Sequence, residues 1–90
     1  MIRCYQLTIQ GRVQGVGFRY WLKNQADECG IYGIAKNLAD GSVYAEIESE
    51  ETKALDFIEK CRQGPPLAHV SRIAVLESAV KDYSDFSIKR

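Results

Sequence analysis

Two stretches of the sequence alternate between hydrophobic and polar residues, which is the pattern of a β-strand with one buried face. The first covers residues 3–10 and the second begins at residue 43. The inward positions are Tyr5, Leu7 and Ile9 in the first stretch and Val43, Ala45 and Ile47 in the second. Three further strands are expected over residues 32–37, 70–76 and 86–88. An Asp-Gly pair within residues 38–41 predicts a hairpin between the second and third strands.

Two other stretches repeat hydrophobic residues every three or four positions, as a helix with one buried stripe does. The stripes comprise Phe18, Trp21, Leu22, Gln25, Ala26 and Cys29 in the first and Ala54, Phe57, Ile58 and Cys61 in the second. Gly30 is a natural end for the first helix. Ser49 is expected to cap the second helix, which Gly64 and the two prolines after it end.

The resulting order is strand, helix, strand, strand, helix, strand, followed by a short extra terminal strand. One antiparallel sheet with two helices on one face would bury both helical stripes and the inward faces of the strands. The pattern therefore predicts an α+β, ferredoxin-like βαββαβ sandwich that forms a single domain over residues 1–90. Many unrelated functions share that fold, so the function must come from particular residues.

A glycine-spaced loop follows the first strand, and Arg19 stands where the first helix should begin. Gly15 and Gly17 allow a tight turn in which successive N–H groups face one concavity. A helix N-terminus and a planar guanidinium both favour an anion there. The spacing matches neither a Walker A loop nor a dinucleotide fingerprint. From the residues alone, an anion site and a purely structural turn both remain open.

Residues 11–19, which read GRVQGVGFR, resemble the signature of the acylphosphatase family. Residues 33–37 and 41–43 resemble the family's second motif, in which the asparagine is catalytic. The resemblance spans nearly the whole chain. Ile34 stands where the family usually has an aromatic residue, and Ser49 where a glycine often follows the third strand. Neither is a catalytic position.

The resemblance implies hydrolysis of the carboxyl–phosphate bond of small acyl phosphates by direct attack of water. It assigns catalysis to Arg19 and Asn37. The phosphate-binding residues that it implies are Gln14, Gly15, Val16, Gly17, Phe18 and Arg19. No cofactor and no metal are implied, and the partner is the small acyl phosphate itself.

Strand parity permits the two implied catalytic residues to meet. Asn37 shares a face with Ala35 and Gly33, whose small size suits a face that is closely covered by helices, and Arg19 begins the first helix on that covered side. Lys36 faces the opposite side and is expected to be solvated. Two other interpretations remain open: a turn-capping asparagine at position 37 and a solvated helical arginine at position 19.

The chemistry of an acyl phosphate suits a chain with little catalytic machinery. The leaving carboxylate has a conjugate acid with a pKa of roughly 4, so it departs without being protonated. The sequence has no clustered metal ligands and no Ser-His or Cys-His pair near the loop. The single histidine, His69, is expected to be structural or superficial.

Twelve basic and twelve acidic residues cancel, so no broad positive field would gather nucleic acid or an anionic membrane. Cys4, Cys29 and Cys61 lack metal-type spacing and suit a reducing cytoplasm. A cytoplasmic monomer is therefore expected. An RNA-binding module would need aromatic residues on the open sheet face, where Tyr44 stands with two glutamates. A domain that binds phosphate or carbamoyl phosphate without turnover remains the alternative.

Overall fold

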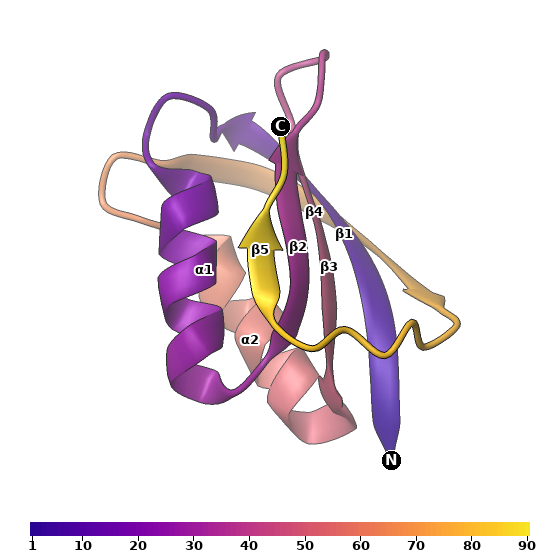
Figure 1. Ribbon diagram of the computed structural model, residues 1–90. Coiled ribbons are helices and arrows are strands. Elements are labelled where there is room, and N and C mark those ends of the chain that lie inside the picture. The colour runs from indigo at the N-terminus through magenta and orange to yellow at the C-terminus, as the bar shows by residue number, and fades with distance from the viewer.

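The alternating stretches form one five-stranded sheet, and both helices pack on the same face of it (Figure 1). The computed structural model describes residues 1–90. Its elements, in chain order, are β1 (Ile2–Arg12), α1 (Phe18–Cys29), β2 (Tyr32–Asn37), β3 (Val43–Glu50), α2 (Glu51–Gln63), β4 (His69–Ser78) and β5 (Phe86–Ile88). The strands lie in the order β4-β1-β3-β2-β5. The predicted ferredoxin-like arrangement is confirmed.

The sheet is mixed rather than wholly antiparallel. β1 pairs antiparallel with β3 and β4, and β2 pairs antiparallel with β3 across the predicted hairpin. β5 instead runs parallel to β2, with Gly33 opposite Phe86. The prediction of an antiparallel sheet was therefore wrong at this last strand. After β4 the chain crosses the open face of the sheet to the opposite edge. There β5 pairs with β2 and runs in the same direction as β2.

Register places the predicted inward residues on the helix-covered face. Ala45 lies opposite Leu7 on one side and Ala35 on the other, and all three are fully buried. One cluster of 18 buried residues joins this face to the helices. Each large aliphatic or aromatic side chain in it contributes roughly 1.5–3 kcal/mol by leaving water. The buried helical positions are Phe18, Leu22 and Ala26 in α1 and Ala54, Phe57, Ile58 and Cys61 in α2.

The ends of the helices follow the sequence with one exception. Gly30 and Gly64 end α1 and α2 as predicted. The N-cap of α2 is Glu50, and Ser49 does not cap it, contrary to the prediction. Ser49 remains paired with Arg3 in the sheet, and its hydroxyl donates to the carbonyl of Glu50 at 3.0 Å. Strand pairing therefore continues up to the helix and takes precedence over a side-chain cap. Neither helix is long and apolar enough to cross a membrane.

The face of the sheet opposite the helices is partly covered by the chain itself. Residues 79–85, here named the strap, run from β4 across this face to β5 (Figure 1). Two glutamates of β3 hold the strap: Glu48 accepts hydrogen bonds from the backbone N–H groups of Lys81 and Tyr83. Glu46 accepts the hydroxyl of Tyr83 at 2.6 Å and pairs with the Lys81 ammonium at 2.9 Å. Both glutamates are buried: 7% of the surface of Glu46 and 4% of that of Glu48 are exposed.

Gly33 occupies the place in β2 where the backbone of β3 comes closest. Its φ of 152° is one that side chains rarely adopt, and a Cβ there would lie 1.7 Å from the carbonyl oxygen of Glu46. Its N–H donates to the carbonyl of Asp85 at 2.9 Å, at the end of the strap. Glycine at this position is thus required by backbone contact across the strand pair, and not only by the helix packing that the sequence indicates.

Candidate active site

The loop between β1 and α1 has the backbone shape expected of an anion site. Gly15 and Gly17 both have positive φ angles, 75° and 78°. Gly17 is also the N-cap of α1, and its carbonyl accepts the N–H of Trp21 at 2.9 Å. None of the backbone hydrogen bonds in the turns and loops is donated by residues 15–19. These N–H groups are therefore free to bind an anion at the positive end of the helix.

A small cavity brings the two predicted catalytic residues together. It has a volume of about 110 Å³, and Arg19 and Asn37 both line it. The other lining residues are Val13, Gly15, Gly17, Phe18 and Tyr20. Arg19 comes from the first turn of α1 and Asn37 from the last position of β2, on the helix-covered face shared by Ala35. The convergence that strand parity permits is thus present in the structure.

The side chains of Arg19 and Asn37 are half-buried, and few protein groups contact their polar atoms. The Arg19 guanidinium donates one long hydrogen bond, 3.4 Å from Nη1 to the carbonyl of Lys89 beyond β5. Its remaining N–H groups have no protein acceptor. Asn37 makes no side-chain hydrogen bond, while Asp40 accepts the N–H and the hydroxyl of Ser42 in the hairpin turn. The turn-capping interpretation of Asn37 is therefore wrong, because Asp40 performs that role.

Gln14 lies beside the cavity and holds its walls together. Its side-chain amide donates to the carbonyls of Leu38 and Ser42, both at 2.8 Å. These two bonds use both amide hydrogens and fasten the glycine loop to the β2–β3 turn. Val16 is partly buried against the hydrophobic core. The side chains of Gln14 and Val16 do not line the cavity, so only their backbone groups could contact a bound anion.

Four of the predicted phosphate-binding residues line the cavity: Gly15, Gly17, Phe18 and Arg19. The Phe18 side chain is core, with 2% of its surface exposed, so its N–H is the group available to a ligand. Two lining residues were missed, Val13 and Tyr20. The helical period indicates that Tyr20 lies off the buried stripe of α1. The sequence alone does not reveal that this exposed side faces a cavity.

A larger hollow adjoins the cavity on the side of α1 that faces β5. It has a volume of about 770 Å³, and it shares Arg19 and Tyr20 with the smaller cavity. Lys23 lines it and donates to the carbonyl of Phe86 at 2.9 Å and to the carboxylate of Asp27 at 3.1 Å. The two hollows therefore form neighbouring compartments that meet at the Arg19 side chain.

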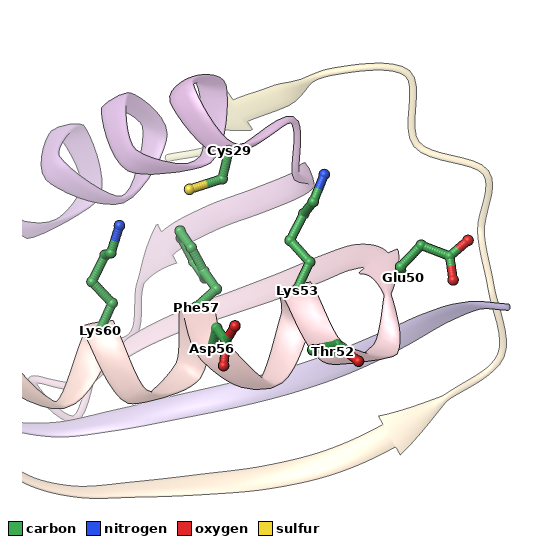
Figure 2. Close-up of a pocket in the computed structure, with 7 residues that line it drawn as sticks. All are labelled: Cys29, Glu50, Thr52, Lys53, Asp56, Phe57 and Lys60. Atoms are coloured by element: carbon green, nitrogen blue, oxygen red, sulfur yellow. The ribbon is translucent and has the colours of Figure 1, made fainter.

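Figure 2 shows a separate groove of about 560 Å³ between the two helices. Phe57 of α2 lies between the lysines at positions 53 and 60, and the thiol of Cys29 extends toward it from α1. None of the predicted site residues lines this groove. Cys4 and Cys61 are fully buried, and burial raises the pKa of the Cys61 thiol to about 12. The cysteines thus lie apart from the cavity.

The histidine, cysteine and carboxylate side chains of the chain do not line the cavity. His69 is exposed in the first position of β4, where it lies opposite Arg12 of β1 in the strand register. No group of three His, Cys, Asp or Glu residues is close enough to hold a metal ion. Hydrogen bonds from the hydroxyl and the N–H of Ser42 lower the pKa of Asp40, which stabilises its ionised form as a turn acceptor. The cavity itself offers N–H groups, a guanidinium and an amide.

Comparisons with known proteins agree on one family. The family model for acylphosphatase matches residues 5–88. An acylphosphatase of Lactiplantibacillus plantarum is 44% identical over 88 residues, covering 97% of this chain and 98% of that protein. An acylphosphatase of Acaryochloris marina is 42% identical over 89 residues, which are 99% and 96% of the two chains. The crystal structure of acylphosphatase from Bacillus subtilis superposes with a TM-score of 0.95 and 37% identity, covering all of both chains.

Proposed function

This chain belongs to the acylphosphatase family, and from that membership we propose that Arg19 and Asn37 carry out its reaction. The enzyme hydrolyses the carboxyl–phosphate bond of small acyl phosphates, releasing a carboxylate and inorganic phosphate. One observation carries the assignment of roles. Arg19 and Asn37 line a single small cavity together with the glycine loop, whose N–H groups are unpaired.

The phosphoryl group of the substrate binds to the N–H groups of residues 15–19 and to the Arg19 guanidinium. In a loose transition state, negative charge spreads over the three equatorial phosphoryl oxygens. Loop N–H groups at a helix N-terminus are fixed before the reaction and need no reorganisation to stabilise that charge. Arg19 adds a planar pair of donors that matches two oxygens at once. The backbone of Gln14 and Val16 completes the loop without their side chains.

Asn37 orients the attacking water. Its side-chain oxygen accepts a hydrogen bond from the water, and the water oxygen then attacks phosphorus in line with the leaving group. The bond from phosphorus to the acyl oxygen breaks, and its electron pair leaves with the carboxylate. The water proton is released to solvent or to a phosphate oxygen. Asn37 thus acts by position and does not serve as a base.

A carboxylate leaving group makes this simple site sufficient. Its conjugate acid has a pKa of roughly 4, so the group departs as an anion at neutral pH. An alkoxide, which leaves from an alkyl phosphate monoester, requires a proton donor or a Lewis acid. The cavity offers no carboxyl, imidazole or ammonium group, because its polar side chains are a guanidinium, an amide and the hydroxyl of Tyr20.

We also propose that the enzyme acts as a cytoplasmic monomer without a resident metal or cofactor. Three free cysteines, two of them fully buried, support a reducing compartment. The alternative function is a module of the same fold that binds phosphate or carbamoyl phosphate without turnover. An assay of phosphate release separates the two functions, since the alternative predicts binding with no release.

Removing metal ions by chelation and changing the leaving group of the substrate together test this mechanism. Benzoyl phosphate hydrolysis should continue at an unchanged rate after exhaustive treatment with EDTA, because no step uses a metal. Phenyl phosphate should be a much poorer substrate under the same conditions, since the cavity holds no carboxyl, imidazole or ammonium group to protonate its leaving oxygen. Phosphate release measured for both substrates, before and after chelation, gives the result. Activity that EDTA removes and Mg²⁺ or Zn²⁺ restores would overturn the mechanism.

A further inference from the structure

The hollow between α1 and β5 is placed where the acyl part of a substrate would extend. Arg19 and Tyr20 line both this hollow, of about 770 Å³, and the small cavity of about 110 Å³. A phosphoryl group bound to Arg19 therefore has the larger hollow directly beside it. The smaller cavity has little room for anything beyond the reacting group and a water molecule. The acyl group must then lie outside it.

The walls of the larger hollow are basic, although the chain as a whole is neutral. Besides Arg19, it is lined by Lys23 and Arg90, against one carboxylate from Asp85. Lys23 uses two of its three N–H donors on Asp27 and the carbonyl of Phe86, which leaves one free. Arg90 is exposed and forms no ion pair in the structure. Two cationic groups thus remain available beyond Arg19.

The same hollow also offers apolar surface. The ring of Tyr20, with 64% of its surface exposed, and Ile88 of β5 both line it. An acyl chain or ring could lie against these two side chains and place a distal group near Lys23 and Arg90. Apolar surface together with two cations in one hollow is what an anionic acyl group would need.

We propose that this hollow is an acyl subsite that favours acyl phosphates carrying a second negative charge, specifically a carboxylate on the acyl group. The proposal rests on the proposed function, because it takes the phosphoryl group to bind at Arg19 and the glycine loop. Lys23 and Arg90 are the specificity-determining residues. The acyl body contacts Tyr20 and Ile88, and the distal carboxylate pairs with the two cations.

The size of the preference follows from the exposure of the subsite. Both cations lie near solvent, and Asp27 and Asp85 offset part of their charge. An exposed ion pair contributes little, so each cation should account for about a two- to fivefold preference. Salt should weaken the preference, because screened charges interact less at high ionic strength. The ratio of kcat/KM for two matched substrates measures the effect directly.

Benzoyl phosphate and 4-carboxybenzoyl phosphate form the matched pair, with each kcat/KM divided by the uncatalysed rate of that compound. The wild-type ratio should favour the carboxylated substrate. Arg90→Gln and Lys23→Gln should each lower the ratio about two- to fivefold, and Arg90→Glu should lower it further. Glutamine at position 23 removes the charge and keeps a neutral N–H donor on the side of α1 that faces β5. Lys60→Gln, on α2 and outside this hollow, should leave the ratio unchanged.

The outcomes separate the subsite from the proposed function. A wild-type enzyme that hydrolyses neither compound contradicts the proposed function itself. Hydrolysis of both compounds, with the same ratio in wild type and in the variants at positions 23 and 90, overturns the subsite and leaves the proposed function intact. An equal fall of the ratio in Lys60→Gln also overturns it, since the effect would then come from general charge. A ratio that falls only in the variants of the hollow supports it.

Discussion

Individual residues of the site divide into those that face the cavity and those that hold it in shape. Arg19 and Asn37 belong to the first group. The sequence indicates that they could meet, because strand alternation places Asn37 on the helix-covered face and Arg19 stands at the predicted start of the first helix. Gln14 belongs to the second group, which no sequence pattern identifies. Its place in the glycine loop suggests contact with phosphate, whereas its amide binds two carbonyls of a turn more than twenty positions away.

The contribution of Gln14 can be measured by shortening it. Gln14→Ala removes two hydrogen bonds between the loop and the turn, so the free energy of unfolding should fall by about 1–3 kcal/mol. The loosened loop should also lower kcat/KM for benzoyl phosphate about tenfold, because the donors are no longer held in place. Urea unfolding beside steady-state kinetics gives both values. Gln63→Ala, at an exposed position in the last turn of α2, is the control. Wild-type stability in Gln14→Ala would show that the two bonds do not fasten the loop.

Among the elements, the strap is the one that the sequence did not predict. Helices and paired strands carry periodic patterns, and their order and most of their ends follow from those patterns. Residues 79–85 have no period, so nothing indicates that they cross the open face of the sheet. Alternation correctly places Glu46 and Glu48 on that face, but it implies solvent there. The structure instead buries both carboxylates under the strap, where Tyr83 and Lys81 satisfy them. The position of β5 beside residues 33–35 of β2 depends on this segment.

The charge on Glu46 should make the strap sensitive to acid. Burial alone would raise the pKa of Glu46, but hydrogen bonds from Tyr44, Tyr83 and Lys81 outweigh burial and hold the pKa below its usual value. A carboxyl whose pKa is lower in the folded state stabilises the protein above the unfolded pKa, about 4.3 for glutamate. That stabilisation is lost as the pH falls through the folded pKa.

Glu46→Gln should therefore lower the free energy of unfolding at pH 7 by about 1–3 kcal/mol, because it removes the ion pair with Lys81 and leaves one hydroxyl without its acceptor. The difference from wild type should shrink as the pH falls below about 4.3 and then through the lower folded pKa, where the native wild-type carboxyl also loses its charge. Thermal unfolding of both proteins, from pH 7 to below about pH 4.3, measures this difference in stability. Glu59→Gln removes an exposed pair with Arg62 and should change stability little. A difference that is constant with pH would show that the charge on Glu46 does not stabilise the strap.

At the scale of the whole molecule, the predicted sandwich and the shared core emerged from periodicity, while the mixed sheet did not. The parallel pairing of β5 depends on where the chain crosses, and that route has no sequence signal. Net charge also acts at this scale. Twelve cations and twelve anions leave no overall field, so attraction of a substrate must come from local groups such as the free N–H donors of the loop.

The edge strand β4 bears on the oligomeric state that we propose. Val75 and Leu76 are exposed on it, Leu76 at 64%, and a bare strand edge can pair with another copy. Arg72 and Glu77 flank these residues and oppose such pairing, since edge charges are costly to bury. Light scattering should thus give a mass near the 10.2 kDa of one chain across a wide concentration range. A mass that doubles with concentration would contradict the monomer.

The central claim is that Arg19 holds the phosphoryl group and that Asn37 positions the water. Arg19 contacts phosphate in the ground and transition states, so Arg19→Gln should weaken phosphate binding and lower turnover together. Arg19→Lys should recover little, because a single ammonium cannot bind two oxygens in a planar fork. Asn37→Ala should keep phosphate affinity near wild type and lower kcat roughly a hundred- to a thousandfold. Arg62→Gln, at an exposed position of α2 that does not line the cavity, is the control for removing an arginine.

Calorimetric affinity for inorganic phosphate, measured beside kcat for benzoyl phosphate in the same variants, tests the claim most directly. We predict that Asn37→Ala binds phosphate with near-normal affinity and has little turnover, whereas Arg19→Gln loses both. An Asn37→Ala enzyme that lost phosphate binding but kept its turnover rate at saturating substrate would contradict this division of roles.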